Sequence, residues 1–223
     1  MKRMIRIGAL IMLALTSFTT VLAIEPESVS DTTKPRTLFG SGEFTSGGFG
    51  GPVAKVTSID GNTSLLVGGR GAWVINKTIA IGGGGYGLVT PRTLREGVGT
   101  TDRDTMMNLG YGGAEIEFII SSSDLLHFSV MTLVGAGDVS TTTSRTMWDE
   151  DDERGSGTIT SDAFFVLEPQ VNVELNVTDW FRMAAGVSYR LVNGVDSQVG
   201  SIKLDDKMLS GVAGVLTFKF GMY

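Results

Sequence analysis

Residues 165–177 read FVLEPQVNVELNV, and their side chains alternate between two kinds. One face of this stretch carries only apolar residues: Phe165, Leu167, Pro169, Val171, Val173, Leu175 and Val177. The other face is mainly polar and holds Val166, Glu168, Gln170, Asn172, Glu174 and Asn176. A period of two residues is the period of a β-strand, so the stretch predicts a long strand with one apolar face and one polar face.

The same alternation recurs in residues 181–191 and 216–222, and weaker strand patterns precede them. We expect eight strands: 47–59, 63–75, 79–90, 105–120, 125–139, 161–177, 181–194 and 210–223. From the second connection onward, tight turns alternate with long polar loops. Up-and-down barrels of the bacterial outer membrane have this asymmetry, with short periplasmic turns and longer external loops. An even strand count places both chain ends on the periplasmic side.

Alternation alone does not distinguish a membrane barrel, which is apolar outside, from a soluble one, which is apolar inside. The strands are long enough to cross a bilayer at a tilt, and the apolar faces of the clearest strands carry no charge. Aromatic residues next to the tight turns form an expected girdle: Trp73, Phe118, Phe128, Phe181 and Phe220. We therefore predict an all-β chain forming an eight-stranded antiparallel up-and-down transmembrane β-barrel. The alternative is a soluble, lipocalin-like periplasmic barrel.

The N-terminal segment predicts export. Residues 1–23 combine a basic start, a short apolar run and Val21-Leu22-Ala23, which is the pattern of a cleaved signal peptide. Residues 24–46 read as a flexible periplasmic leader, and residues 47–223 as the outer-membrane barrel. Losing the three bases of the signal peptide leaves 15 of the 18 bases against 24 acids, a formal charge of −9. This acidity argues against a nucleic-acid partner, and the absence of cysteine excludes disulfides and thiolate metal sites.

Glycine-rich strand segments carry a resemblance to a known class of protein. These segments are residues 47–52, 66–73, 82–88, 108–113 and 217–221. They resemble uncharacterised outer-membrane β-barrel proteins of Bacteroidetes-like Gram-negative bacteria, and the architecture is similar to small OmpA/OmpX-type eight-stranded barrels. The resemblance implies a fold and a compartment, and it carries no established activity. Tyr223 departs from the usual C-terminal assembly signal, since it falls on the opposite face from Phe218 and Phe220.

Strand parity predicts which polar side chains point into the barrel. The expected lumen network contains Arg70, Glu115, Glu117, Glu168, Asn172, Glu174, Arg182, Arg190 and Lys219, with Lys55 and Asn176 as further members. Buried charges must be paired, since an isolated one costs several kcal/mol. A plugged lumen of ion pairs and amides is therefore expected, and a narrow path for protons or ions is the alternative.

His127 and Ser129 are the only catalytic candidates. A His-x-Ser on a barrel strand resembles the catalytic pair of outer-membrane lipid A deacylases, in which histidine activates serine. Parity turns both residues toward the lumen, and both follow a tight turn far from the outer leaflet. A lumen histidine bonded to Glu115 or Glu117 is the favoured interpretation, and no cofactor is expected.

Five consecutive acids, residues 149–153, follow Trp148 in the second long loop. Asp149, Asp151 and Asp152 are candidate metal ligands, although the spacing and glycine of an EF-hand are missing. Like-charge runs are usually solvated, so no metal site is predicted. The glycine-rich run 81–88 lacks a following helix, so close backbone approach explains it better than phosphate binding.

These patterns predict a closed barrel with a structural, envelope-integrity or surface-interaction role. Expected partners are outer-membrane lipid, lipopolysaccharide and the barrel-assembly machinery, with the protein itself a monomer. A lipid-modifying hydrolase and a narrow channel or small-ligand binder are the alternatives.

Overall fold

The computed structural model describes residues 44–59, 61–90, 93–94, 105–143, 158–199 and 202–223. Eight long strands dominate this part of the chain: β1 (Ser46–Ile59), β2 (Asn62–Ile75), β3 (Ile79–Leu88), β5 (Thr105–Ile120), β6 (Leu126–Thr143), β7 (Thr158–Thr178), β8 (Phe181–Asn193) and β11 (Gly211–Met222). Shorter elements lie in the connections: β4 (Thr93–Leu94), β9 (Asp196–Val199), β10 (Ile202–Asp205) and the helical turn α2 (Asp206–Leu209). The predicted segments differ from the long strands by at most four residues at either end.

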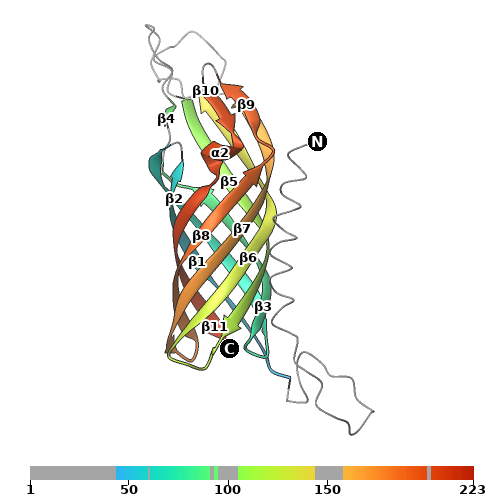
Figure 1. Ribbon diagram of the computed structural model, residues 1–223, viewed down its shortest axis with the longest axis vertical. Coiled ribbons are helices and arrows are strands. Elements are labelled where there is room, and N and C mark those ends of the chain that lie inside the picture. The colour runs from blue at the N-terminus through green and yellow to red at the C-terminus, as the bar shows by residue number, and fades with distance from the viewer. Residues whose placement is uncertain (1–43, 60, 91–92, 95–104, 144–157, 200–201) are drawn as a thin grey trace, which may run out of the picture. The chain divides into compact units, whose positions relative to one another are not determined.

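The eight long strands close into an antiparallel barrel (Figure 1). Each strand pairs with its neighbour along the chain, and β11 pairs back with β1, for example at Lys55 and Val215. The predicted all-β, up-and-down, eight-stranded fold is confirmed. The expected signal peptide, most of the leader and the acidic run 149–153 lie outside the described residues. No helix in the described ranges is both long enough and apolar enough to cross a membrane.

Three tight turns and both described chain ends gather at one end of the barrel, which we name the turn end. Asn76 and Lys77 have φ angles of 48° and 57°, so the β2–β3 turn uses left-handed backbone at both positions. Asn76 also binds Thr45, just before β1: its N–H donates to the Thr45 carbonyl, and its side-chain oxygen accepts from the Thr45 N–H. The opposite end, which we name the far end, carries the longer connections and the β1–β2 turn.

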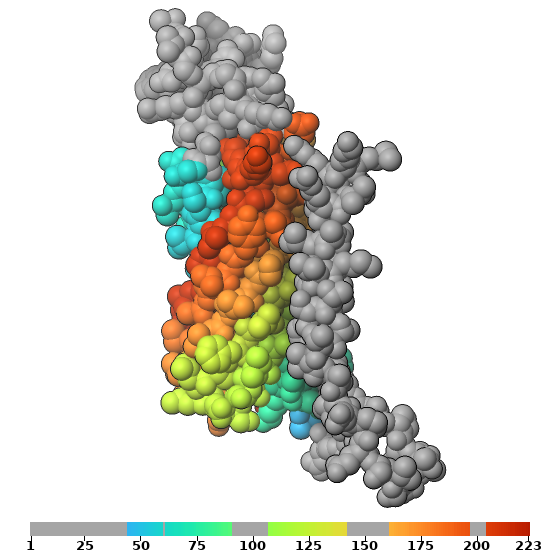
Figure 2. Space-filling view, viewed as in Figure 1, coloured from blue at the N-terminus to red at the C-terminus, as the bar shows by residue number. Residues whose placement is uncertain are grey.

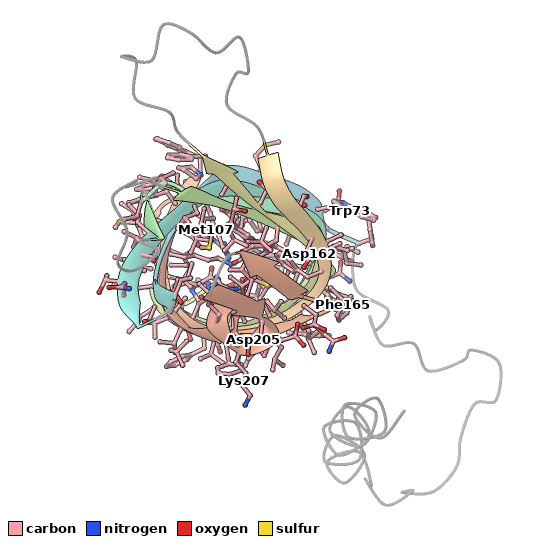
Figure 3. All side chains as sticks on the ribbon, turned by 90° about the horizontal axis from the view of Figure 1, so that it is seen from above. Trp73, Met107, Asp162, Phe165, Asp205 and Lys207 are labelled. Carbon is pink, nitrogen blue, oxygen red and sulfur yellow. The ribbon has the colours of Figure 1, made fainter. Side chains whose placement is uncertain are left out.

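Inward and outward side chains differ sharply in chemistry, as the strand patterns predict. The outward face is apolar and exposed along most strands, as with Trp73 at 52% and Val171 at 51% exposure. The inward face carries the buried polar side chains, among them Lys55 and Glu117, both at 0% exposure. Figure 3 looks along the barrel and shows side chains filling its interior, with Trp73 and Phe165 outside the ring. Figure 2 shows the outward side chains covering one side of the strand wall.

Inward glycines allow this narrow barrel to close. A Cβ added at Gly51 would run into the backbone carbonyl of Phe218, and one at Gly84 would run into the Glu115 carboxylate. The glycine-rich run 81–88 lies within β3, which agrees with close approach rather than a phosphate-binding loop. Outward Gly50 has only the Arg70 carbonyl nearby, at 3.8 Å from the same added Cβ.

The connection 195–209 is a folded cap rather than the polar loop that the sequence predicts. β9 and β10 form a hairpin, and α2 follows with Asp205 as its N-cap. Val195, Leu204 and Leu209 are buried and join the apolar cluster that contains Phe164 and Val166. Asp206 ties the cap to the end of β8 by accepting from the N–H groups of residues 194 and 195. The polar composition of the segment conceals these few apolar residues, which bury the cap against the far end of the barrel (Figure 1).

Candidate functional site

The lumen holds the largest group of buried polar side chains in the described part of the chain. The predicted residues all lie inside, at 0–7% exposure: Arg70, Glu115, Glu117, Glu168, Asn172, Glu174, Arg182, Arg190 and Lys219, with Lys55. All eight long strands contribute, because Tyr86 of β3, Ser129 of β6 and Ser188 of β8 complete the set. The polar groups divide into two clusters along the barrel.

The turn-side cluster is built around two glutamates that share a lysine. Lys219 Nζ lies 2.9 Å from Glu117 Oε1 and 2.5 Å from Glu174 Oε1. The Ser129 hydroxyl lies 2.7 Å and 2.5 Å from the same two oxygens, and the Asn172 amide donates to Ser129 at 3.1 Å. Buried carboxylates are stable only when charge and hydrogen bonds compensate for lost water, and this arrangement supplies both.

Arg70 extends this cluster toward the middle of the barrel. Its Nε donates to Glu115 at 2.7 Å, and its Nη2 donates to Glu117 at 3.2 Å. The other Glu115 oxygen accepts from the Tyr86 hydroxyl at 2.7 Å. One arginine therefore links two glutamates on β5, whose side chains point to the same face because they are two residues apart.

The cap-side cluster centres on Glu168. Lys55 Nζ forms an ion pair with Glu168 at 2.9 Å, and the hydroxyls of Tyr111 and Ser188 donate to it at 2.8 Å and 2.6 Å. These three partners come from β1, β5 and β8, so the cluster crosses the whole barrel. These partners leave little of the Glu168 carboxylate without a contact.

The two clusters meet at an aromatic ring. The Lys55 ammonium lies 3.5 Å from the centre of the Tyr86 ring, while the Tyr86 hydroxyl belongs to the turn-side cluster. A cation over a ring face is attracted electrostatically, but this contact is not a hydrogen bond. Among the described residues, no hydrogen bond joins the two clusters at this junction.

Each end of the network is closed by a further contact. At the far end, Arg190 is fully buried and its Nε donates to the Leu209 carbonyl of α2 at 2.7 Å. At the turn end, Tyr223 stacks on Phe49 with ring centres 5.9 Å apart, and the Arg182 guanidinium lies 3.5 Å from the centre of the Tyr223 ring. Tyr223 lies on the opposite strand face from Phe218 and Phe220, so its ring points into the lumen.

Two expectations about individual residues were wrong. His127 contacts neither Glu115 nor Glu117 but faces Glu174, with Nε2 and Oε2 3.5 Å apart. The β6–β7 register explains this, because it pairs His127 directly with Glu174. Asn176 lies outside the two clusters and donates to the carbonyls of Ser122 and Asp124 in the β5–β6 turn. Its position beside the end of β7 gives it turn carbonyls as its nearest acceptors.

Sequence reasoning missed several members of the network. Tyr111 and Gln170 share the parity of neighbouring glutamates on β5 and β7, so the same pattern could have found them. Tyr86 lies in a strand of glycines where alternation is weak. Strand parity predicts that Ser129 faces the lumen, but not that its hydroxyl contacts Glu117 and Glu174.

The alternative catalytic pairing of His127 with Ser129 is not formed. His127 Nδ1 lies 3.2 Å from the Asp124 carbonyl, and Nε2 faces Glu174. Both residues are buried at 1% exposure. Within the described ranges, no group of three or more histidine, aspartate and glutamate side chains could hold a metal ion. The metal candidates Asp149, Asp151 and Asp152 lie outside those ranges.

The aromatic side chains predicted as a girdle lie near the turn end and point outward. Trp73, Phe118, Phe128 and Phe220 are 44–57% exposed, and Phe181 is half-buried. Phe181 stacks on Phe220 with ring centres 4.9 Å apart. Trp180 and Phe44 add to the same band, Trp180 against Phe220 and Phe44 against Trp73.

Comparison with solved structures finds bacterial surface barrels. One is Ail, the attachment invasion locus protein of Yersinia pestis, with 15% identity, a TM-score of 0.44, and coverage of 79% of this chain and 97% of Ail. Neisserial surface protein A has 11% identity and a TM-score of 0.45 over 81% of this chain and 99% of its own. The outer membrane protease OmpT from Escherichia coli has 10% identity and a TM-score of 0.37 over 82% and 98%. No protein-family model matches the chain, and no curated protein matches it.

Proposed function

We propose that this protein is a closed barrel of the outer membrane that contributes to envelope integrity or surface contact. The observation that carries the proposal is the sealed lumen. Ion pairs and hydrogen bonds from all eight long strands fill its middle, Tyr223 and Phe49 occupy the turn end, and the cap packs on the far end. An eight-stranded barrel has room for packed side chains and little else.

The outward face supports a lipid environment. Large apolar side chains stand 38–52% exposed at the centre of several strands: Val134, Val171, Val187 and Leu216. A continuous apolar surface of this kind marks contact with lipid or with another protein, and the buried charges inside match the polar interior of a membrane barrel. The outward aromatic band near the turn end matches the position of an interfacial girdle.

The orientation follows from the arrangement of the connections. Short turns and both chain ends would face the periplasm, and the cap and longer connections would face the cell exterior. The expected partners are outer-membrane lipid, lipopolysaccharide and the barrel-assembly machinery, and the barrel acts as a monomer. Export through a cleaved signal peptide belongs to the same proposal.

A transport path has less support from the geometry. A path for ions would have to pass the contacts of Lys219 with Glu117 and Glu174 and the Lys55–Glu168 pair, whose nitrogen–oxygen distances are 2.5–2.9 Å. A proton relay would also have to cross the Tyr86 ring, where the hydrogen bonds stop. A hydrolase based on Ser129 lacks a histidine base in contact with the hydroxyl.

Planar-bilayer recording of the purified, folded protein tests the closed lumen. We expect no conductance steps above those of the bare membrane, while an open porin reconstituted in the same way gives steps. A heat-dependent shift in gel migration confirms that the inserted protein is folded. Reproducible steps from the folded wild-type protein would contradict the proposal and favour the channel alternative.

A further inference from the structure

The Arg190 guanidinium lies buried under the cap with two of its three nitrogens unused. Arg190 is 0% exposed, and its Nε donates to the Leu209 carbonyl at 2.7 Å. Its Nη1 and Nη2 have no hydrogen-bond partner among the described residues. Buried polar atoms in native proteins are almost always paired, and a buried charge without a partner is especially costly. The two nitrogens therefore call for an acceptor that the side chains around them do not supply.

The acidic side chains near Arg190 are already engaged elsewhere. Both oxygens of Glu168 accept hydrogen bonds from the three partners in the cap-side cluster. On the cap itself, Asp205 accepts from an N–H of the first turn of α2, and Asp206 accepts from two N–H groups just after β8. These carboxylates stabilise the cluster and the cap and leave Nη1 and Nη2 of Arg190 without a counterion.

A count of buried charges also leaves one cation over. In the described part of the lumen, five buried basic side chains accompany four buried carboxylates, with His127 counted as neutral. In the turn-side cluster three bases balance three carboxylates, because Arg182 interacts electrostatically with two of the glutamates and adds its charge to the two ion-paired bases. The surplus positive charge therefore lies in the cap-side cluster, where Lys55 and Arg190 accompany Glu168 alone.

The surroundings of Arg190 favour a small anion with a single charge. The inward residues one step nearer the cap, Val166 and Val192, are apolar, and Leu209 lies on the cap above them. They provide no side-chain donors for the several oxygens of a phosphate or sulfate, whose double charge would also exceed the surplus of one. A halide matches this site better, since it accepts hydrogen bonds from any direction and its charge equals the surplus.

We infer that the cap-side lumen binds a halide, with chloride as the abundant example, on Nη1 and Nη2 of Arg190 beneath the cap. The bound ion balances the second cation of the cluster, and one guanidinium then joins the ion to the Leu209 carbonyl. Met107, inside the ring of strands (Figure 3), and Met208 belong to the same apolar cluster, and their unbranched side chains shift easily to make room. Because both nitrogens are enclosed, the ion enters and leaves only when the cap opens, so halide binding holds the cap on the barrel.

Bromide provides a direct test, because it resembles chloride and can be located by its anomalous X-ray scattering. Crystals of the folded protein grown in sodium bromide should show an anomalous peak within hydrogen-bond distance of Nη1 and Nη2 of Arg190. The absence of a peak there, with the Arg190 side chain ordered in the electron density, overturns the inference.

Trypsin cleavage tests the effect of the ion on the cap in solution. Cleavage after Lys207 on α2 reports cap opening, and cleavage after Lys77 at the turn end corrects for any effect of salt on the protease. Sodium chloride replaces sodium gluconate at constant sodium concentration. We expect cleavage after Lys207 to slow by about tenfold when chloride reaches ten times its dissociation constant, because a ligand of the closed state reduces opening in proportion to its occupancy.

Two variants locate the site. Arg190→Gln should abolish the chloride dependence of cleavage after Lys207. Arg182→Gln removes the same charge at the turn end and should keep the wild-type ratio of cleavage rates between the two salts. Equal rates in chloride and gluconate for the wild-type protein, or a chloride dependence that survives in Arg190→Gln, overturns the inference. If Arg190→Gln does not fold, bromide diffraction and the wild-type cleavage rates still decide it.

Discussion

Replacing Lys219 with methionine removes the ammonium that lies between Glu117 and Glu174. The two carboxylates are 0% exposed and 2.9 Å and 2.5 Å from the lysine nitrogen. Methionine has a similar length and fills the same space, so the change tests charge rather than packing. Glu117 and Glu174 then remain buried without the ammonium group that both contact in the wild-type protein.

Breaking a buried ion pair by removing one partner costs about 3–5 kcal/mol. Arg70 still donates to Glu117 at 3.2 Å, and Ser129 still contacts both glutamates, so we expect the lower end of this range. A loss of about 3 kcal/mol lowers the folding equilibrium constant by about two powers of ten. Urea unfolding of the barrel in lipid vesicles, followed by tryptophan fluorescence, measures this loss.

Lys207→Met is the matched control, since Lys207 is exposed on α2 and its replacement should change stability by at most about 0.5 kcal/mol. The double variant Lys219→Met/Glu174→Gln removes one charge of each sign and should recover part of the loss, with a coupling of about 0.5–3 kcal/mol. A Lys219→Met protein within about 1 kcal/mol of the wild type refutes the view that ion pairs hold the lumen together. If the single variant does not fold, recovery of folding in the double variant provides the same test.

Three further perturbations probe the wall, the cap and the outward face. Gly51→Ala places a methyl against the Phe218 carbonyl and should lower the free energy of unfolding by about 1–3 kcal/mol. Its neighbour Gly50→Ala should be neutral or stabilise the barrel by up to about 1 kcal/mol. Equal urea midpoints for the two variants would contradict this steric account. Arg190→Met removes the hydrogen bond to the Leu209 carbonyl, which is worth about 1.5–3 kcal/mol. Trypsin should therefore cleave after Lys207 at least about tenfold faster in this variant than in the wild type, while cleavage after Lys77 is unchanged. Equal cleavage rates after Lys207 in the two proteins would show that Arg190 does not secure the cap. Val171→Arg puts a charge at the centre of the outward face of β7 and should lower the free energy of unfolding in vesicles by about 2–4 kcal/mol. Thr178→Arg, at the strand end, should lower it by at most about 1 kcal/mol. No loss of stability in Val171→Arg would indicate that this face contacts water.

Strand positions and facing were predictable because a barrel repeats one simple rule. Residues 165–177 alternate without interruption, so β7 and the inward positions of Glu168, Asn172 and Glu174 follow from parity alone. The pairing of charges inside also follows in outline, since buried charges require partners. Which glutamate meets which base depends on the register and tilt of strands far apart in the sequence, as the contact of Lys219 with Glu117 shows.

The cap and the contact of His127 with Glu174 were not predictable, for different reasons. The cap depends on a few apolar side chains, Val195, Leu204 and Leu209, whose spacing fits no regular period. His127 faces Glu174 only because β6 and β7 pair in a particular register, and a shift of two residues would give it another neighbour. Tyr86 lies among glycines, whose lack of side chains removes the alternation that assigns a face.

Two-sided cysteine labelling tests most directly whether the barrel spans the outer membrane. The chain has no cysteine, so Lys207→Cys at the far end and Asp179→Cys at the turn end each supply a single exposed thiol. The reagent is a maleimide polymer too large for outer-membrane porins, applied to intact cells of a Gram-negative host. The spanning barrel predicts that Lys207→Cys is labelled in intact cells and that Asp179→Cys is labelled only after the outer membrane is opened. Labelling of both thiols in intact cells, or of neither until the membrane is opened, contradicts it.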